Sequence, residues 1–189
     1  LFSAVSPSAF ASLTTQQRQE DFAQLVNIME RNYGPLRWKQ EHLKLDFKGL
    51  VSEYQTKIQS LKSDTEFYET MARFLSEFKD AHISSAVPST YRSNLGFLCD
   101  YIQGKVLIDT INRLRLPEVF FPFNKGDQLL AIGGVPVEKL MADISKTGTT
   151  GNDATNLRIA AARLTSRTES SGFAVPNGVT TVTVHPQGA

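Results

Sequence analysis

One short stretch of this 189-residue chain carries residues that could take part in catalysis. His82 follows Asp80 by two positions, at the predicted end of a long helical segment. An imidazole can accept a proton near neutral pH, and a neighbouring carboxylate can orient it, so the pair could form a general base and its support. The other residues offer no evident nucleophile for this base to activate. The pattern therefore predicts one part of a two-part active site.

The two serines nearest to His82 do not fit the role of a nucleophile. A short β-prone segment, 82–87, is expected here, and in an extended strand Ser84 and Ser85 would point to opposite faces. No serine of the chain lies in the strained strand-to-helix turn that characterises a nucleophile elbow. We interpret both serines as strand-surface residues.

Other side chains give little support for a metal or cofactor. Cys99 is the only cysteine, which excludes an intrachain disulfide and a multi-thiolate site, and His42 and His185 have no partner at ligand spacing. We expect no metal, no cofactor, and a buried, unreactive Cys99. Asp127 lies beside a predicted turn and is expected to be solvated.

Charge and hydropathy give little support to two further classes of partner. The chain has 20 Lys and Arg against 19 Asp and Glu, with no basic cluster interleaved with aromatics, so nucleic-acid binding has little support. No apolar run reaches the roughly 20 residues of a membrane-spanning helix. Residues 1–13 are expected to form a terminal arm or the remnant of a secretory signal, because Ala9-Phe10-Ala11 resembles an A-x-A cleavage end. The second alternative predicts a secreted, periplasmic or cell-envelope protein.

The segment before His82 has the periodicity of amphipathic helices. Capping boxes at Thr14 and Ser63, and an N-cap at Asp46, each precede apolar residues at helical spacing. Residues 36–45 are expected to form an ordered connection after Gly34-Pro35. The pattern predicts a compact helical bundle within a domain of residues 14–92, which ends in the strand that carries Asp80-Ala81-His82.

Beyond His82 the pattern changes to short strands. A hairpin is predicted with its turn at Gln103-Gly104, between the apolar-rich segments 95–102 and 105–111. A buried strand is predicted just before Gly133-Gly134. Helices are expected at 137–144 and 154–167, and a last strand at 178–185. Helices followed by a mixed unit predict an α+β fold.

The phrase from Gly126 to Val137 resembles part of a bacterial PDZ module, which places a PDZ-like domain at residues 93–189 with short strands and two helices. By this resemblance, Leu95-Gly96-Phe97 would be a carboxylate-binding loop. Glycine lets backbone N–H groups approach a terminal carboxylate, and the following strand could accept a peptide by β-addition. The alternative is that Leu95-Gly96-Phe97 is only an apolar strand with a turn.

The whole arrangement resembles the tricorn and C-terminal-processing serine peptidases. The residues that carry the resemblance are the strings 32–39, 80–82, 164–167 and 172–178. The resemblance implies that His82 is the general base of a Ser-His-Glu arrangement, with Asp80 as its local support. The serine and glutamate would come from a crotonase-like α/β domain that follows the PDZ-like one.

This resemblance also sets the expected partners. They are protein or peptide substrates and a C-terminal catalytic domain or fragment of the same protein; a homodimer is left open. By itself the 189-residue chain would be inactive, because it lacks the nucleophile. Two alternatives stay open: a peptide-binding adaptor without catalysis, and an inactive peptidase homologue in which His82 is structural.

Overall fold

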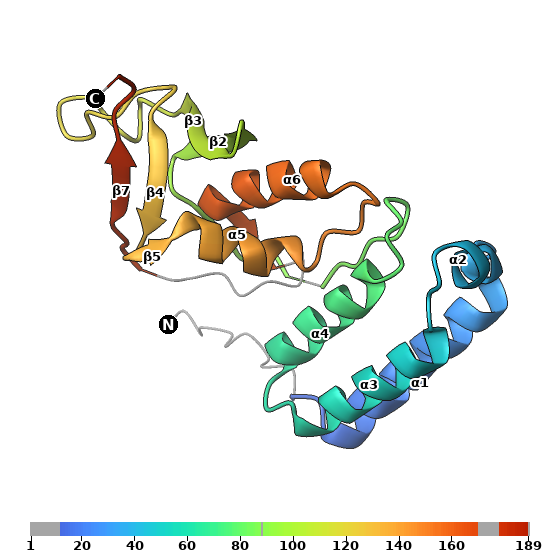
Figure 1. Cartoon of the computed structure of the whole chain (residues 1–189). Helices are drawn as coiled ribbons and strands as arrows, with labels where there is room; N and C mark the ends of the chain where they lie inside the picture. The colour runs from blue at the N-terminus through green and yellow to red at the C-terminus, as the bar shows by residue number, and fades with distance from the viewer. Residues whose placement is uncertain (1–11, 88, 170–177, 189) are drawn as a thin grey trace, which may run out of the picture. The chain divides into compact units, whose positions relative to one another are not determined.

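The computed structural model describes residues 12–87, 89–169 and 178–188 (Figure 1). These residues form two compact units that divide between Thr70 and Met71, inside helix α4 (Asp64–Ser76). The signal-like Ala9-Phe10-Ala11 and most of the string 172–178 lie outside the described residues. The domain boundary at residue 92 stays a prediction.

The N-terminal unit is built from helices whose ends match the sequence signals. Helix α1 (Thr15–Asn32) begins at a capping box in which Thr14 and Gln17 exchange hydrogen bonds, and Asp46 caps α3 (Phe47–Ser60) by accepting from the Gly49 N–H. Ser63 and Glu66 form a second capping box at α4. Each box satisfies N–H groups that a helix leaves without a partner in its first turn.

One element of this unit differs from the expectation. The connection predicted at 36–45 contains a short helix, α2 (Leu36–His42). Pro35 occupies its N-cap position with φ −71°, and its residues are mostly strong helix formers, which together favour a helix over an irregular link.

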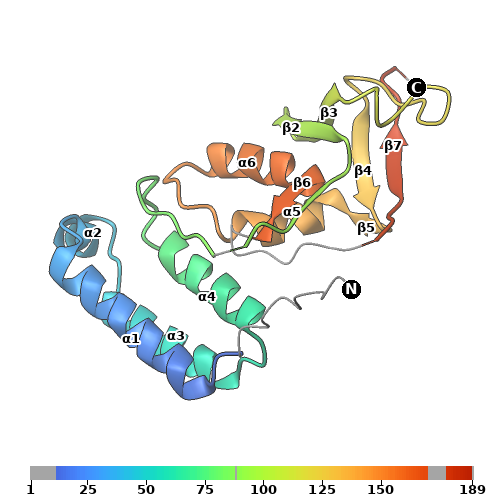
Figure 2. The same ribbon diagram turned by 180° about the vertical axis from the view of Figure 1, so that it is seen from behind.

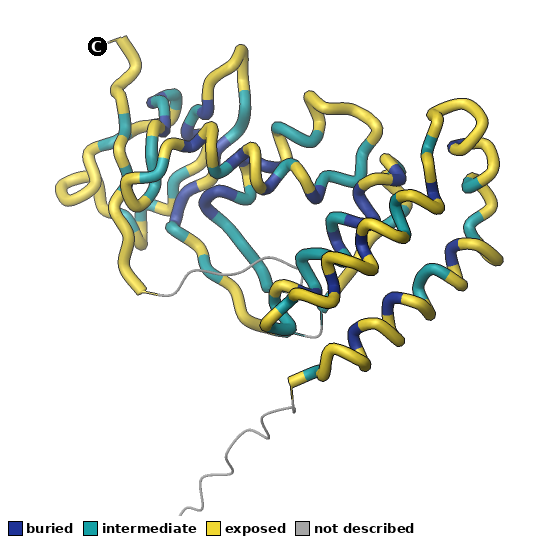
Figure 3. The backbone as a smooth tube through the Cα atoms, turned by 60° about the horizontal axis from the view of Figure 1, so that its bottom comes forward, coloured by how far each residue is buried: buried dark blue, intermediate teal, exposed yellow. Residues whose placement is uncertain are grey.

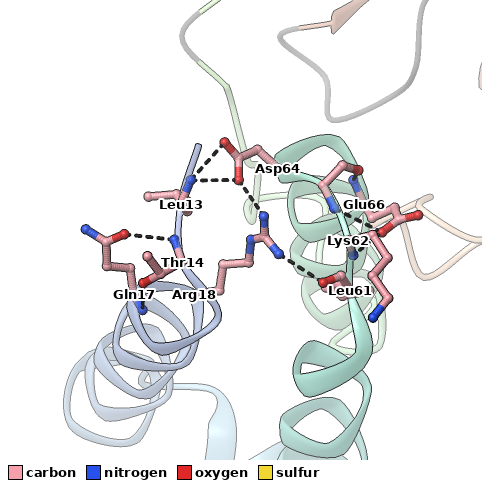
Figure 4. A network of polar contacts seen from close by, with 9 residues as sticks. Leu13, Thr14, Gln17, Arg18, Leu61, Lys62, Asp64 and Glu66 are labelled. Atoms are coloured by element: carbon pink, nitrogen blue, oxygen red, sulfur yellow. Dashed lines mark hydrogen bonds and ion pairs between the residues drawn. The ribbon is translucent and has the colours of Figure 1, made fainter. Parts of the chain in front are cut away.

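The helices of this unit pack through an apolar stripe and are tied by a buried arginine. The buried side chains are Phe22, Met29, Phe47, Tyr54, Ile58 and Phe67. Arg18, 3% exposed, donates to the Leu61 carbonyl and to Asp64, while Asp64 also accepts the Leu13 N–H (Figure 4). This network joins the start of α1 to the start of α4.

The C-terminal unit contains an antiparallel sheet and two helices. Strands β2 (Phe97–Ile102), β3 (Lys105–Ile111), β4 (Gln128–Ile132) and β5 (Val135–Pro136) follow in spatial order, and β7 (Val182–His185) pairs with β4. Helices α5 (Val137–Ser145) and α6 (Asp153–Thr165) lie side by side (Figures 1 and 2). The sheet holds both Leu129 and Val182, as the alternating pattern predicts.

Turn chemistry and burial explain this arrangement. Gln103 and Gly104 both have positive φ, 50° and 81°, which matches the twist of the β2–β3 hairpin. The inward residues of the sheet meet α5 and α6 in one core. Figure 3 colours its buried residues, like those of the N-terminal unit, dark blue. The buried members of this core are Phe97, Cys99, Val106, Ile108, Leu129, Val137, Met141, Ile144, Ala160, Ala161 and Leu164. The α+β fold class is confirmed.

Two expected elements have different bounds in the structure. Helix α6 ends at Thr165, because Ser166–Thr168 forms strand β6, which pairs with β1 (Arg92–Asn94). The strand expected at 82–87 is absent. Asp80 instead closes a turn, since its side chain accepts the His82 N–H and its carbonyl accepts the Ile83 N–H, which removes donors that a ladder would need.

Asp127 was expected to be solvated and is buried. It is 5% exposed, and its two carboxylate oxygens accept the N–H groups of Asn124 and Gln187 at 2.7 and 2.8 Å. A carboxylate can be buried when backbone donors replace its water. Asp127 therefore ties the loop before β4 to the residues after β7.

Candidate functional site

The structure brings His82 and Asp80 into direct contact. Nδ1 of His82 lies 3.0 Å from Oδ1 of Asp80, and the same oxygen accepts the His82 backbone N–H at 3.0 Å. Lys79, at φ +47°, turns the chain just before this pair, after α4 has ended. This turn therefore holds the His82 imidazole within hydrogen-bond distance of the Asp80 carboxylate.

The contact defines which nitrogen could act as a base. An ionised carboxylate only accepts hydrogen bonds, so Nδ1 carries the proton in this pair, and neutral His82 then has an unprotonated Nε2. Among the described residues, Nε2 has no hydrogen-bond partner. The His82 side chain is 97% exposed and that of Asp80 only 14%, so the support is fixed while the imidazole is open to solvent.

No hydroxyl of the described residues hydrogen-bonds to His82. Ser84 and Ser85 face a separate hollow of about 110 Å³ that they share with Thr147, Gly148 and Arg163. The arrangement can position a base, and it needs a nucleophile from elsewhere to complete nucleophilic catalysis.

Leu95 and Gly96 lie between β1 and β2, and Phe97 begins β2. Two N–H groups of this segment already have acceptors. The Leu95 N–H donates to the Thr165 carbonyl at 2.9 Å, and the Gly96 N–H donates to the Asn94 side chain at 2.6 Å. Gly96 has φ +89°, a left-handed conformation that favours glycine, and a Cβ there would lie 3.0 Å from Leu116. Phe97 is buried in the core. A carboxylate at this loop would have to compete with the internal acceptors.

A salt bridge between strand β2 and helix α6, the Asp100–Arg158 clasp, was not predicted from the sequence. Arg158 of α6 donates through Nε and Nη2 to the two carboxylate oxygens of Asp100, at 2.9 and 2.5 Å, and Asp100 also accepts the Tyr101 N–H at 2.7 Å. The hydrogen bond from Arg158 holds the pKa of Asp100 below its usual range. Because 58 residues separate the two partners, no local spacing could indicate this pair.

Neither a metal cluster nor a membrane-spanning helix is found among the described residues. Cys99 is 4% exposed, and burial together with the charge of Asp109 raises the pKa of its thiol to about 12. Cys99 is thus a buried core residue, as expected.

Comparisons with known proteins bear on both parts of the chain. A family model described as a PDZ domain matches residues 91–188, just over half of the chain. A protein of Chlamydia trachomatis serovar D is 24% identical over 187 residues, and an uncharacterized protein of Chlamydia muridarum is 25% identical over the same length. Each match covers 95% of this chain and 29% of the relative, so the chain spans less than a third of these relatives.

Solved structures show where the fold recurs. Mature CPAF, the chlamydial protease-like activity factor, superposes with a TM-score of 0.77 at 22% identity, covering 92% of this chain and 32% of that one. Its complex with lactacystin gives the same TM-score and identity, with 92% and 33% covered. At this identity the likeness establishes the fold. The resemblance of the sequence to the peptidase family described above, of which CPAF is a member, is confirmed at the level of fold.

Proposed function

Because the chain belongs to the PDZ domain family through residues 91–188, we propose that it is the peptide-recognising, base-carrying N-terminal region of a CPAF-like serine endopeptidase. In this proposal His82 is the general base and Asp80 its orienting support. The serine nucleophile and a glutamate come from a C-terminal domain, as in the resemblance to the tricorn and C-terminal-processing peptidases. The substrates are proteins or peptides.

The observation that carries the proposal is the geometry of His82. Its Nδ1 is fixed by a carboxylate at 3.0 Å, and its side chain is 97% exposed. A serine hydroxyl is a poor nucleophile until an imidazole accepts its proton, and that imidazole must be held in one tautomer. A structural histidine gains nothing from an open Nε2, whereas a base requires it.

The test is the turnover of a protein substrate by the full-length protein. His82→Ala should lower kcat by roughly 10⁴–10⁶-fold, because only binding and oxyanion stabilisation are left. Asp80→Asn should also lower kcat, because an amide can donate to Nδ1 and favour the wrong tautomer. Thermal unfolding should change little for His82→Ala, since an exposed side chain contributes few packing contacts.

His42→Ala is the matched control. His42 is also an exposed histidine whose Nδ1 lies 3.0 Å from an oxygen, the Trp38 carbonyl, so its loss should leave kcat unchanged. If His82→Ala kept near-normal turnover, or unfolded the protein, the role of His82 as a base would be wrong.

The second candidate function is the peptide-binding adaptor. It rests on the PDZ domain match at residues 91–188, because such a module can bind peptides without cleaving them. A full-length protein that binds peptides and never cleaves them, with or without His82, would support this second function.

A further inference from the structure

The loop between β3 and β4, residues 112–127, exposes a group of large apolar side chains. Leu114 is 97% exposed, Val119 81%, Phe120 75% and Phe121 39%, and we call these four side chains the apolar tip. The loop lies at the end of the sheet where β4 begins and β7 ends, drawn in yellow in Figures 1 and 2. Single exposed apolar residues are ordinary, but several in one segment mark a surface that another molecule covers.

This exposure follows from how the loop is folded, because Arg113 fixes its backbone. The Arg113 guanidinium donates to the carbonyls of Leu116, Phe121 and Phe123, at 3.3, 2.9 and 2.5 Å. Leu116 and Phe123 pack against the core of the C-terminal unit, and the ring centroids of Phe97 and Phe123 lie 5.2 Å apart. The loop thus buries its apolar underside and is held with the apolar tip outside.

Positive charge lies in the same loop as the apolar tip. Arg113 and Arg115 donate to neutral oxygens, and no carboxylate of the described residues pairs with either guanidinium. The third basic residue, Lys125, is paired with Asp109 at 3.0 Å, and Glu118 is the only exposed acid of the loop. Exposed apolar side chains next to positive charge that no carboxylate neutralises match a surface with an apolar interior and negative headgroups.

We propose that this loop docks on a lipid bilayer that contains anionic headgroups. The apolar tip enters the boundary between headgroups and acyl chains, and the charges of Arg113 and Arg115 lie near the headgroup phosphates. A standard protein interface needs roughly 20–30 residues a side, far more than the four side chains of the tip. A bilayer has no such requirement, since it only has to bury the tip. The proposal rests neither on His82 nor on peptide recognition.

The experiment is sedimentation of the protein with two kinds of vesicle, one of phosphatidylcholine alone and one of equal parts phosphatidylcholine and phosphatidylserine. The 189-residue chain should bind the anionic vesicles at least about tenfold more tightly, because each arginine near the surface adds to the attraction. High salt should weaken that binding. Equal binding to both kinds of vesicle, or binding to neither, would overturn the proposal.

Substitutions in the apolar tip show whether its side chains enter the bilayer. Leu114→Ser and Phe120→Ser should each weaken binding to both kinds of vesicle about tenfold, because an apolar side chain that the bilayer buries is lost. Thermal unfolding should change little, since both side chains are exposed in the fold. Val179→Ser is the matched control, because Val179 is also fully exposed and lies outside the loop. Equal losses for Val179→Ser and Leu114→Ser would rule out the loop as the docking surface.

Arg115→Gln tests the contribution of charge. It should weaken binding to the anionic vesicles about fivefold and leave binding to phosphatidylcholine vesicles unchanged. Arg158→Gln removes the same charge from α6 of the same unit, outside the loop, and should leave binding to both kinds unchanged. Equal losses for the two variants would mean that net charge drives binding, and the assignment to this loop would be wrong.

The full-length protein tests what covers the loop. It should bind the anionic vesicles as the 189-residue chain does. If only the 189-residue chain bound, the rest of the protein would cover the loop, and if the tip variants instead abolished self-association, a second copy would cover it. Either result would overturn the assignment to lipid. None of these outcomes depends on turnover, so the proposal for His82 is tested separately.

Discussion

At the scale of single residues, the surroundings of a side chain decide its chemistry more than its type does. His82 and His42 each have Nδ1 3.0 Å from an oxygen, but the acceptor is a carboxylate at His82 and a backbone carbonyl at His42. A carboxylate can stabilise the imidazolium that forms when a base accepts a proton. A neutral carbonyl does so far less, and the His42 ring also stacks on Trp38, with ring centroids 5.0 Å apart. Of these two histidines, His82 has the surroundings that its proposed role as a base requires.

Cys99 allows a prediction at this scale. Its pKa of about 12 means that the thiol stays protonated at pH 8, and its burial denies access to reagents. The native chain should therefore not react with a disulfide-forming aromatic reagent at pH 8, whereas the urea-unfolded chain should react fully at its single thiol. Absorbance of the released thiolate measures both. Rapid modification of the native chain would contradict the buried position.

At the scale of elements, polar contacts decide how helices join. In the N-terminal unit, the Asp64 carboxylate accepts hydrogen bonds from the buried Arg18 side chain and from the Leu13 N–H at the same time. Burial of the carboxyl opposes ionisation, but the hydrogen bonds from Arg18 and from Leu13 outweigh it, so the pKa of Asp64 is lowered. The ionised carboxylate is thus the form that stabilises the fold.

This direction predicts how stability depends on pH. The folded-state pKa of Asp64 lies below its unfolded value of about 3.9, so its contribution is complete above that pH and is lost as the pH falls through the folded pKa. Asp64→Asn should lower the free energy of unfolding by about 1–3 kcal/mol at pH 7. The difference from the unchanged protein should shrink as the pH falls below about 4.

Urea denaturation at pH 7 and at pH 3 checks this prediction. Glu53→Gln is the control, because the Glu53–Lys57 pair has both side chains at least half exposed and should contribute little at either pH. A difference for Asp64→Asn that stayed constant with pH would show that the charge of Asp64 is not what stabilises the network.

At the scale of the whole molecule, helix α4 belongs to both units. The division between Thr70 and Met71 falls within its 13 residues, and buried side chains lie on both sides, Phe67 before it and Phe74 after it. A break in the middle of α4 would displace the buried side chains on both sides of it, Phe67 and Phe74, and so weaken the packing of each unit. The units should therefore lose stability together when α4 is broken.

Thr70→Pro tests this continuity. Proline removes a backbone N–H and clashes with the preceding turn, which costs about 3 kcal/mol or more in a helix interior. Trp38 is the only tryptophan and lies in the N-terminal unit, so its fluorescence follows that unit, while far-UV circular dichroism follows the whole chain. Both unfolding midpoints should fall, whereas Thr70→Ala should change them little. An unchanged Trp38 transition would mean that the N-terminal unit does not need an intact α4.

Local signals in the sequence were enough to predict most elements. The capping boxes at Thr14 and Ser63, the turn at Gln103-Gly104 and the strand before Gly133-Gly134 all recur in the structure. These features depend on neighbours within a few residues, so spacing reveals them. The pairing of Asp80 with His82 is local for the same reason, and its contact follows from a separation of two residues.

Contacts between distant residues were decided only by the tertiary structure. Asp127 became buried because Gln187, 60 residues away, supplies a donor, and α6 ended early because Ser166–Thr168 pairs with β1. The Asp100–Arg158 clasp likewise joins segments far apart in the chain. The sequence thus determined most of the elements and the contact between Asp80 and His82, since short-range hydrogen bonds and apolar periodicity specify them. Which polar groups are buried, paired or left without a partner depends on which segments meet in space.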